Sequence, residues 1–115
     1  MTILIVVNDA PYASERPYNA LRLATALRED GEDALRVFSL GDGAWCAVGD
    51  QTVPEGMHDI DWMLRRFLPG ATAAVCRTCM EARGIRGDQL IPGAAESALQ
   101  ALKEWTRTSD RVMVF

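Results

Sequence analysis

The chain has 115 residues, 49% of them hydrophobic and 24% charged, which predicts one folded domain over residues 1–115 with a core of its own. A net charge of −4 argues against a broad nucleic-acid face, because phosphate binding needs a basic surface. Three cysteines make a poor disulfide framework, which favours a reducing, cytoplasmic compartment. The apolar runs are too short for a membrane span, and without a basic leader we expect no secretory signal.

Strand patterns alternate with helix patterns along the chain. Continuous β-branched apolar runs are typical of strands buried on both faces, and apolar residues three and four apart are typical of helices that pack on a sheet. The expected elements are a strand at 3–7, a helix from an N-cap at Ser14 to a stop at Gly31, a strand at 35–40, a short helix at 44–48, a helix at 60–67, a strand at 71–75, a short helix ending at Gly84, a brief strand at 90–91, a helix over 95–105 and a strand at 111–115. This alternation predicts a three-layer α/β/α domain with a mostly parallel sheet of about five strands, flavodoxin-like in layout.

Functional sites in such folds gather at the carboxyl ends of the strands. The loops at 8–12, 41–46 and 76–79 each follow an expected strand, so we expect all three to share one edge of the sheet. This arrangement would bring Cys46 within reach of Cys76. The candidate residues at this edge, besides the cysteines at 76 and 79, are Asn8, Tyr12, Cys46, Arg77 and Arg83.

Cys76 is the strongest candidate for a reactive group. It ends an apolar run and opens a short helix, where its sulfur would meet unpaired backbone N–H groups and the positive end of the helix dipole. Both favour the thiolate, which is the form that attacks sulfur. The competing interpretation is a buried structural thiol, since free cysteine is among the most buried residue types.

Cys79 completes a Cys-x-x-Cys pattern, which occurs in dithiol redox proteins and in zinc sites. On a shared helix Cys79 lies at i+3 from Cys76, on a neighbouring face, from which it could resolve a persulfide by forming a disulfide. Zinc would need two further ligands, and only Cys46, the single His58 and carboxylates are available, so we expect neither a metal nor a cofactor. For Cys46, simple packing is the favoured interpretation.

Several segments, in order along the chain, resemble one known family. They are residues 3–12, Glu15-Arg16, residues 18–24, Leu40-Gly41-Asp42-Gly43, and the segment from Cys76 to Arg83-Gly84-Ile85. The family is the DsrE/DsrF-like family, which includes the TusD-like proteins of sulfur relay. Its carrier cysteine lies eight residues before the glycine of an Arg-Gly-Ile element, which is the distance from Cys76 to Gly84. The resemblance therefore assigns the carrier role to Cys76.

The resemblance implies a sulfurtransferase or sulfur carrier that passes persulfide sulfur between protein thiols. It also implies sulfur-donor and sulfur-acceptor proteins as partners, no direct contact with nucleic acid, and a homotrimer or homohexamer, with a mixed assembly as a further option. Arg77 and Arg83 are candidates to stabilise the anion. Cys79 departs from the carrier members, which often have a small residue there, so a dithiol redox protein is an alternative. A non-catalytic oligomeric module with incidental cysteines is a third interpretation.

Overall fold

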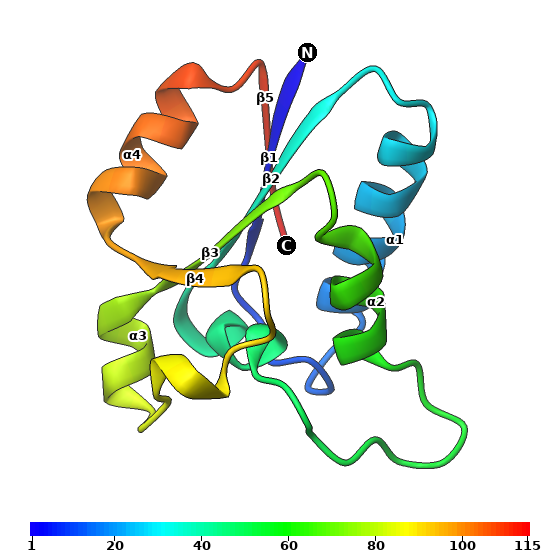
Figure 1. The fold of residues 1–115 in the computed structure, drawn as a ribbon, viewed down its shortest axis with the longest axis vertical. Coiled ribbons are helices and arrows are strands. Elements are labelled where there is room, and N and C mark those ends of the chain that lie inside the picture. Colours follow the sequence, from blue (N-terminus) through cyan, green and yellow to red (C-terminus); the bar gives the residue numbers. More distant parts are fainter.

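The computed structural model describes residues 1–115 as a three-layer α/β/α fold, with helices on both faces of a parallel sheet (Figure 1). The five strands lie in the order β4-β3-β2-β1-β5. The strands are β1 (Thr2–Val7), β2 (Ala34–Ser39), β3 (Thr72–Cys76), β4 (Ala94–Ser97) and β5 (Arg111–Val114). The helices are α1 (Arg16–Glu29), α2 (Ile60–Phe67), α3 (Arg77–Ala82) and α4 (Leu99–Thr108), with short 3₁₀ helices η1 (Gly41–Ala47) and η2 (Gly87–Gln89). The predicted fold class is confirmed.

The sheet separates two hydrophobic clusters of unequal size. Because side chains alternate along a strand, Ile5 of β1 faces a core of 21 buried residues under α1 and α2, whereas Leu4 faces a cluster of five under α4. The smaller cluster is closed by α4, whose Trp105 meets the Phe38 ring edge-on with the centroids 5.9 Å apart. In Figure 1, α1 and α2 accordingly lie on one side of the sheet and α4 on the other. None of the helices is both long enough and apolar enough to cross a membrane.

The carboxyl ends of β1, β2 and β3 lie level with one another. In the parallel register Val7 pairs with Ser39, and Ser39 pairs with Val75. The segments that follow these strands therefore meet, and the Gly43 N–H of η1 donates to the Asn8 carbonyl at 2.9 Å. The expectation that the strand-end loops share one edge is confirmed.

The fourth strand lies further along the chain than expected. Residues 90–91 form no strand, and Leu90 makes only an isolated antiparallel bridge to Val48. The strand is instead β4, with the sequence Ala-Ala-Glu-Ser, which has no β-branched or aromatic residue to mark it. It forms because β3 offers an open edge whose backbone groups need partners.

Two helix starts also differ from the prediction. The last helix begins at Leu99, so Ala95 lies in β4 and not on a helical face. The N-cap of α1 is Glu15, one residue after the predicted Ser14. The Ser14 hydroxyl donates to the Asp9 carboxylate at 2.6 Å and accepts from the Arg16 N–H at 3.2 Å, so it still satisfies a backbone donor at the start of the helix.

Gly43 lies where η1 passes against the end of β1. A Cβ added there would overlap the Val7 carbonyl, so Gly43→Ala has to push η1 away from the sheet. We expect the free energy of unfolding to fall by about 2 kcal/mol or more, measured by urea denaturation. Gly87→Ala is the control, because its added Cβ would meet nothing closer than 3.6 Å. Equal destabilisation by the two substitutions would contradict this account.

Candidate functional site

Cys76 is both the last residue of β3 and the N-cap of α3. Alternation along β3 puts its side chain with Ala74 on the α4 side of the sheet, where Cys76 is only 4% exposed. Its backbone is extended (φ −62°, ψ 118°), and the chain turns directly into α3 after it. The first N–H groups of a helix have no partner within the helix, so those of α3 are available to the Cys76 sulfur.

The groups around the Cys76 sulfur favour its thiolate. The hydroxyl oxygen of Thr78 lies 3.2 Å from the sulfur, a distance at which it donates a hydrogen bond to the anion. Burial opposes ionisation, but the Thr78 hydroxyl, the Cys79 thiol and the backbone N–H groups of both residues together outweigh it. They hold the pKa of Cys76 below its usual value.

Cys79 lies further along α3 and is held by η1. The Gly41 N–H donates to its sulfur at 3.1 Å, and Arg83 binds the Cys79 carbonyl at 3.0 Å and the Asp42 carboxylate at 2.8 Å. Burial and the neighbouring Cys76 raise the pKa of Cys79 more than the Gly41 N–H and Arg83 lower it. The two thiols of the Cys-x-x-Cys pattern therefore differ in acidity, and Cys76 ionises first.

The two candidate arginines have other partners. Arg77 pairs with Glu96 of β4 at 3.7 Å, and both side chains are about half exposed, where an ion pair contributes little. Arg83 joins α3 to η1 through its bond to Asp42. The lowered pKa of Cys76 comes from hydrogen bonds, and arginine charge is not among its causes.

Two other candidates lie at the carboxyl edge without reaching Cys76. The Asn8 side-chain amide donates to the carbonyl of Phe115 at 3.4 Å and so links the end of β1 to the chain terminus. The Tyr12 hydroxyl accepts from the Ile60 N–H at 3.2 Å, which ties the first loop to the start of α2. Their observed contacts join elements of the fold to one another.

Cys46 is separated from Cys76 by the sheet. It belongs to the cluster under α1 and α2, whereas Cys76 belongs to the cluster under α4. Its thiol donates to the Asp9 carbonyl at 3.3 Å, and burial together with the Asp9 carboxylate raises the pKa of Cys46 to about 12. The structure does not bring Cys46 to Cys76, because alternation along β3 directs Cys76 to the α4 face, whereas η1 places Cys46 in the cluster under α1 and α2.

Thr78 and η1 also contribute to the site, and the sequence pattern did not single out either of them. A hydroxyl two residues after a cysteine at an expected helix start is a usable signal, because side chains in a first helical turn reach back toward the cap. No local pattern could reveal the bond from Gly41 to Cys79, whose partners are 38 residues apart.

Comparison with known proteins identifies the family. The DsrE/DsrF-like family matches residues 1–115. The chain belongs to the DsrE/DsrF-like family. Protein YchN of Escherichia coli (strain K12) is 38% identical over 115 residues, which cover 98% of this chain and 97% of YchN. The crystal structure of the ychN protein from E. coli has a TM-score of 0.92 and covers 100% of this chain and 99% of that one.

A sulfurtransferase is also among the relatives of this DsrE/DsrF-like chain. Sulfurtransferase TusD of Salmonella arizonae is 30% identical over 129 residues, which cover 100% of both chains. The predicted family is thereby confirmed. Together, the family and this relative support sulfur relay as the function at the level of the family.

Thr78→Val removes the hydroxyl beside Cys76 while keeping the shape of the side chain. We expect the pKa of Cys76 to rise and alkylation by iodoacetamide at neutral pH to slow about fivefold, because the thiolate loses a hydrogen bond. Rates are measured against pH by mass spectrometry of tryptic peptides, since cleavage after Arg77 separates the two cysteines.

Thr78→Ser is the matched control and should keep the wild-type pH profile, because it retains the hydroxyl. An unchanged profile in Thr78→Val would show that the hydroxyl does not stabilise the thiolate.

Proposed function

We propose that the chain carries persulfide sulfur on Cys76 between protein thiols. The observation that carries the proposal is a thiol with a lowered pKa at the start of α3, in a family with a sulfurtransferase among this chain's relatives. A thiolate with nearby hydrogen-bond donors is what nucleophilic attack on sulfur requires.

The transfer needs no cofactor and no net oxidation. The Cys76 thiolate attacks the outer sulfur of a donor persulfide, the donor's S–S bond breaks, and the donor leaves as a thiolate. Cys76 then holds the persulfide until an acceptor thiolate attacks its outer sulfur and releases the Cys76 thiolate. The donors that lower the pKa of Cys76 also assist this second step, because a thiol of lower pKa is the better leaving group.

The burial of Cys76 suits a carrier that must keep its cargo. A side chain that is only 4% exposed reacts slowly with small thiols, so the sulfur that it carries is lost slowly and loading by a small persulfide requires an excess of reagent. We place this protein in the cytoplasm. The adjacent Arg77 and Thr78 are exposed, so a partner protein would approach over the first turn of α3. The expected partners are sulfur-donor and sulfur-acceptor proteins.

Cys79 supports a second candidate function, a dithiol reaction. Its raised pKa beside the lowered pKa of Cys76 gives one nucleophilic thiol and one protonated thiol in a Cys-x-x-Cys pair. After sulfur loading, Cys79 as thiolate would attack the inner sulfur of the Cys76 persulfide. The Cys76–Cys79 disulfide forms, the bond to the outer sulfur breaks, and that sulfur leaves as hydrosulfide.

Mass spectrometry after loading with glutathione persulfide tests both reactions. We expect the wild-type chain to gain about 32 Da per added sulfur on the Cys76 peptide, and Cys76→Ser to gain none there. Cys46→Ser is the control and should load like the wild type, because Cys46 lies under the opposite face of the sheet.

The Cys79→Ser variant separates the two functions. If the protein is a carrier, Cys79→Ser loads as well as the wild type. If it is a dithiol protein, Cys79→Ser retains more persulfide than the wild type, and the wild-type chain instead forms a disulfide product about 2 Da lighter than the reduced chain. A wild-type chain that gains no sulfur and forms no disulfide, together with a Cys79→Ser variant that gains no sulfur, would leave only a non-catalytic module.

We also propose that the chain assembles as a homotrimer or homohexamer, alone or with homologous subunits. Val112 and Val114 of β5 are 41% and 67% exposed, and Leu99 of α4 is 62% exposed. Val112 pairs with Leu4, so these valines extend the α4 face of the sheet beyond the helix that covers it. An apolar edge of this kind is typical of a subunit contact.

Sedimentation velocity tests the assembly. We expect a mass three or six times that of the 12.6 kDa chain, and a shift to monomer in Val114→Glu, which would bury a charge in the contact. Thr52→Glu makes the same charge change in an exposed loop and should leave the mass unchanged. A monomeric wild-type chain at micromolar concentration would refute the homo-oligomer.

A further inference from the structure

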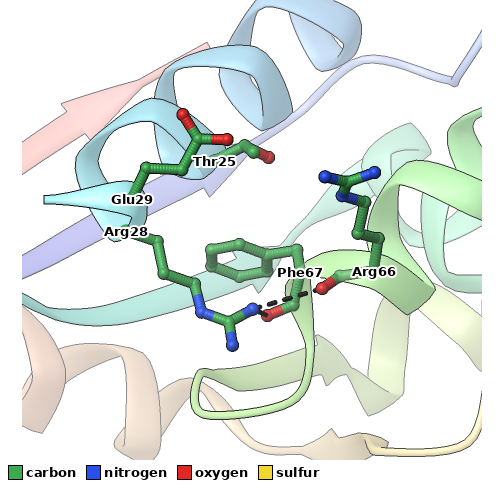
Figure 2. Close-up of a pocket in the computed structure, with 5 residues that line it drawn as sticks. All are labelled: Thr25, Arg28, Glu29, Arg66 and Phe67. Carbon is green, nitrogen blue, oxygen red and sulfur yellow. Dashed lines mark hydrogen bonds between the residues drawn. The ribbon is translucent and has the colours of Figure 1, made fainter. Parts of the chain in front are cut away.

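A groove runs between α1 and α2 on the outer surface of the molecule. One end has a cavity volume of about 320 Å³ and lies between Arg28 and Arg66, above Phe67; Figure 2 shows these side chains with Thr25 and Glu29. The other end, of about 270 Å³, is bounded by Trp62 and shares Arg66 with the first. The two cavities share Thr25, Glu29 and Arg66 in their linings, so they adjoin each other between the helices.

The arginines of the groove lack acidic partners. No carboxylate lies within 4.0 Å of the guanidinium of Arg22, Arg28 or Arg66, although the chain has more acidic than basic residues. Arg28 is occupied on one side, since it donates to the carbonyls of Arg66 and Phe67 at 3.2 and 2.6 Å. The guanidinium of Arg66 lies over the Trp62 ring, 5.3 Å from its centroid, and makes no hydrogen bond to a carboxylate.

The same groove exposes apolar surface. Trp62 is 57% exposed, and Met63 beside it is partly exposed. Tryptophan and arginine are the residues most enriched among those that dominate binding energy at protein interfaces, and methionine adapts to partners of different shape. Unpaired arginines beside an exposed tryptophan fit a ligand that has both carboxylates and apolar side chains.

We propose that this groove binds an acidic, amphipathic segment of a partner protein. Its carboxylates would pair with Arg22 and Arg66, and its apolar side chains would cover Trp62 and Met63. The apolar surface of the groove favours a protein segment over a nucleic acid. Trp62 and Met63 offer contacts for apolar side chains, which a phosphate backbone does not supply. Glu29 on the groove wall opposes any anionic ligand, so the carboxylates of the segment have to lie against the arginines.

The groove lies on the opposite face of the sheet from Cys76, so this inference does not depend on the proposed function. Arg28 and Arg66 lie near the carboxyl ends of α1 and α2, and these helices run antiparallel to the strands. Their carboxyl ends therefore adjoin the amino ends of the strands, whereas Cys76 ends β3 at the opposite edge. A segment held here tethers a partner and does not itself present a thiol to Cys76.

Fluorescence anisotropy with a defined probe tests the proposal on the full chain. The probe is a fluorescein-labelled peptide of about 15 residues with Glu and Leu at helical spacing, compared with the same peptide in which Gln replaces Glu. We expect the Glu peptide to bind, the Gln peptide to bind more weakly, and the affinity for the Glu peptide to fall as NaCl is raised.

Arg66→Glu and Arg107→Glu form a matched pair of variants. Each changes the net charge equally at an exposed residue, but only Arg66 lies in the groove, whereas Arg107 is on α4. We expect Arg66→Glu and Trp62→Ala each to weaken binding about fivefold or more, and Arg107→Glu to leave it unchanged.

Three results would overturn the proposal. One is no binding of the Glu peptide by the wild-type chain at about 1 mM, the weak limit of specific recognition. Another is equal weakening by Arg66→Glu and Arg107→Glu, which would indicate long-range charge alone. The third is tighter, Arg66-dependent binding of a labelled oligouridylate, which would assign the groove to single-stranded nucleic acid.

Discussion

The parallel register of β1, β2 and β3 is the constraint on which the cysteine site depends. Val7, Ser39 and Val75 lie side by side, so the three strands end at one level and the segments after them must share the same space. Gly43 permits η1 to pass against the end of β1, and η1 then lies beside α3. A slip of one residue in this pairing would turn Cys76 toward the opposite face and remove its present neighbours.

Three cysteines in one small fold receive three different chemical environments. Cys76 meets a hydroxyl and free helical N–H groups, which favour its thiolate, while Cys79 meets one N–H and the neighbouring sulfur and keeps its proton more firmly. Cys46 is enclosed among apolar side chains, and its pKa rises to about 12. The difference in acidity among the three thiols follows from these surroundings, since the side chains are chemically identical.

The molecule is also divided between its two ends. The carboxyl ends of the strands hold the thiol chemistry, whereas the opposite end and the α1–α2 surface hold unpaired arginines and Trp62. The two regions differ in whether their arginines have acidic partners. Arg83 near the cysteines is neutralised by Asp42, whereas Arg66 in the groove has no carboxylate partner. Under the two proposals, sulfur transfer and partner attachment would thus occupy separate surfaces of one fold.

The sequence by itself determined the alternation of strands and helices, the fold class and the position of Cys76 at a strand-to-helix junction. These features follow from local apolar patterns such as residues 3–7 and 60–67, which each element needs in order to be buried. Only the tertiary structure decided that residues 94–97 form a strand, that Cys46 faces away from Cys76, and that Gly41 donates to Cys79. Each of these features depends on a neighbour distant in the chain. Residues 94–97 need the open edge of β3, Cys46 is placed by the face of the sheet on which it packs, and Gly41 reaches Cys79 because the parallel register ends the strands at one level. Such neighbours leave no pattern in the local sequence.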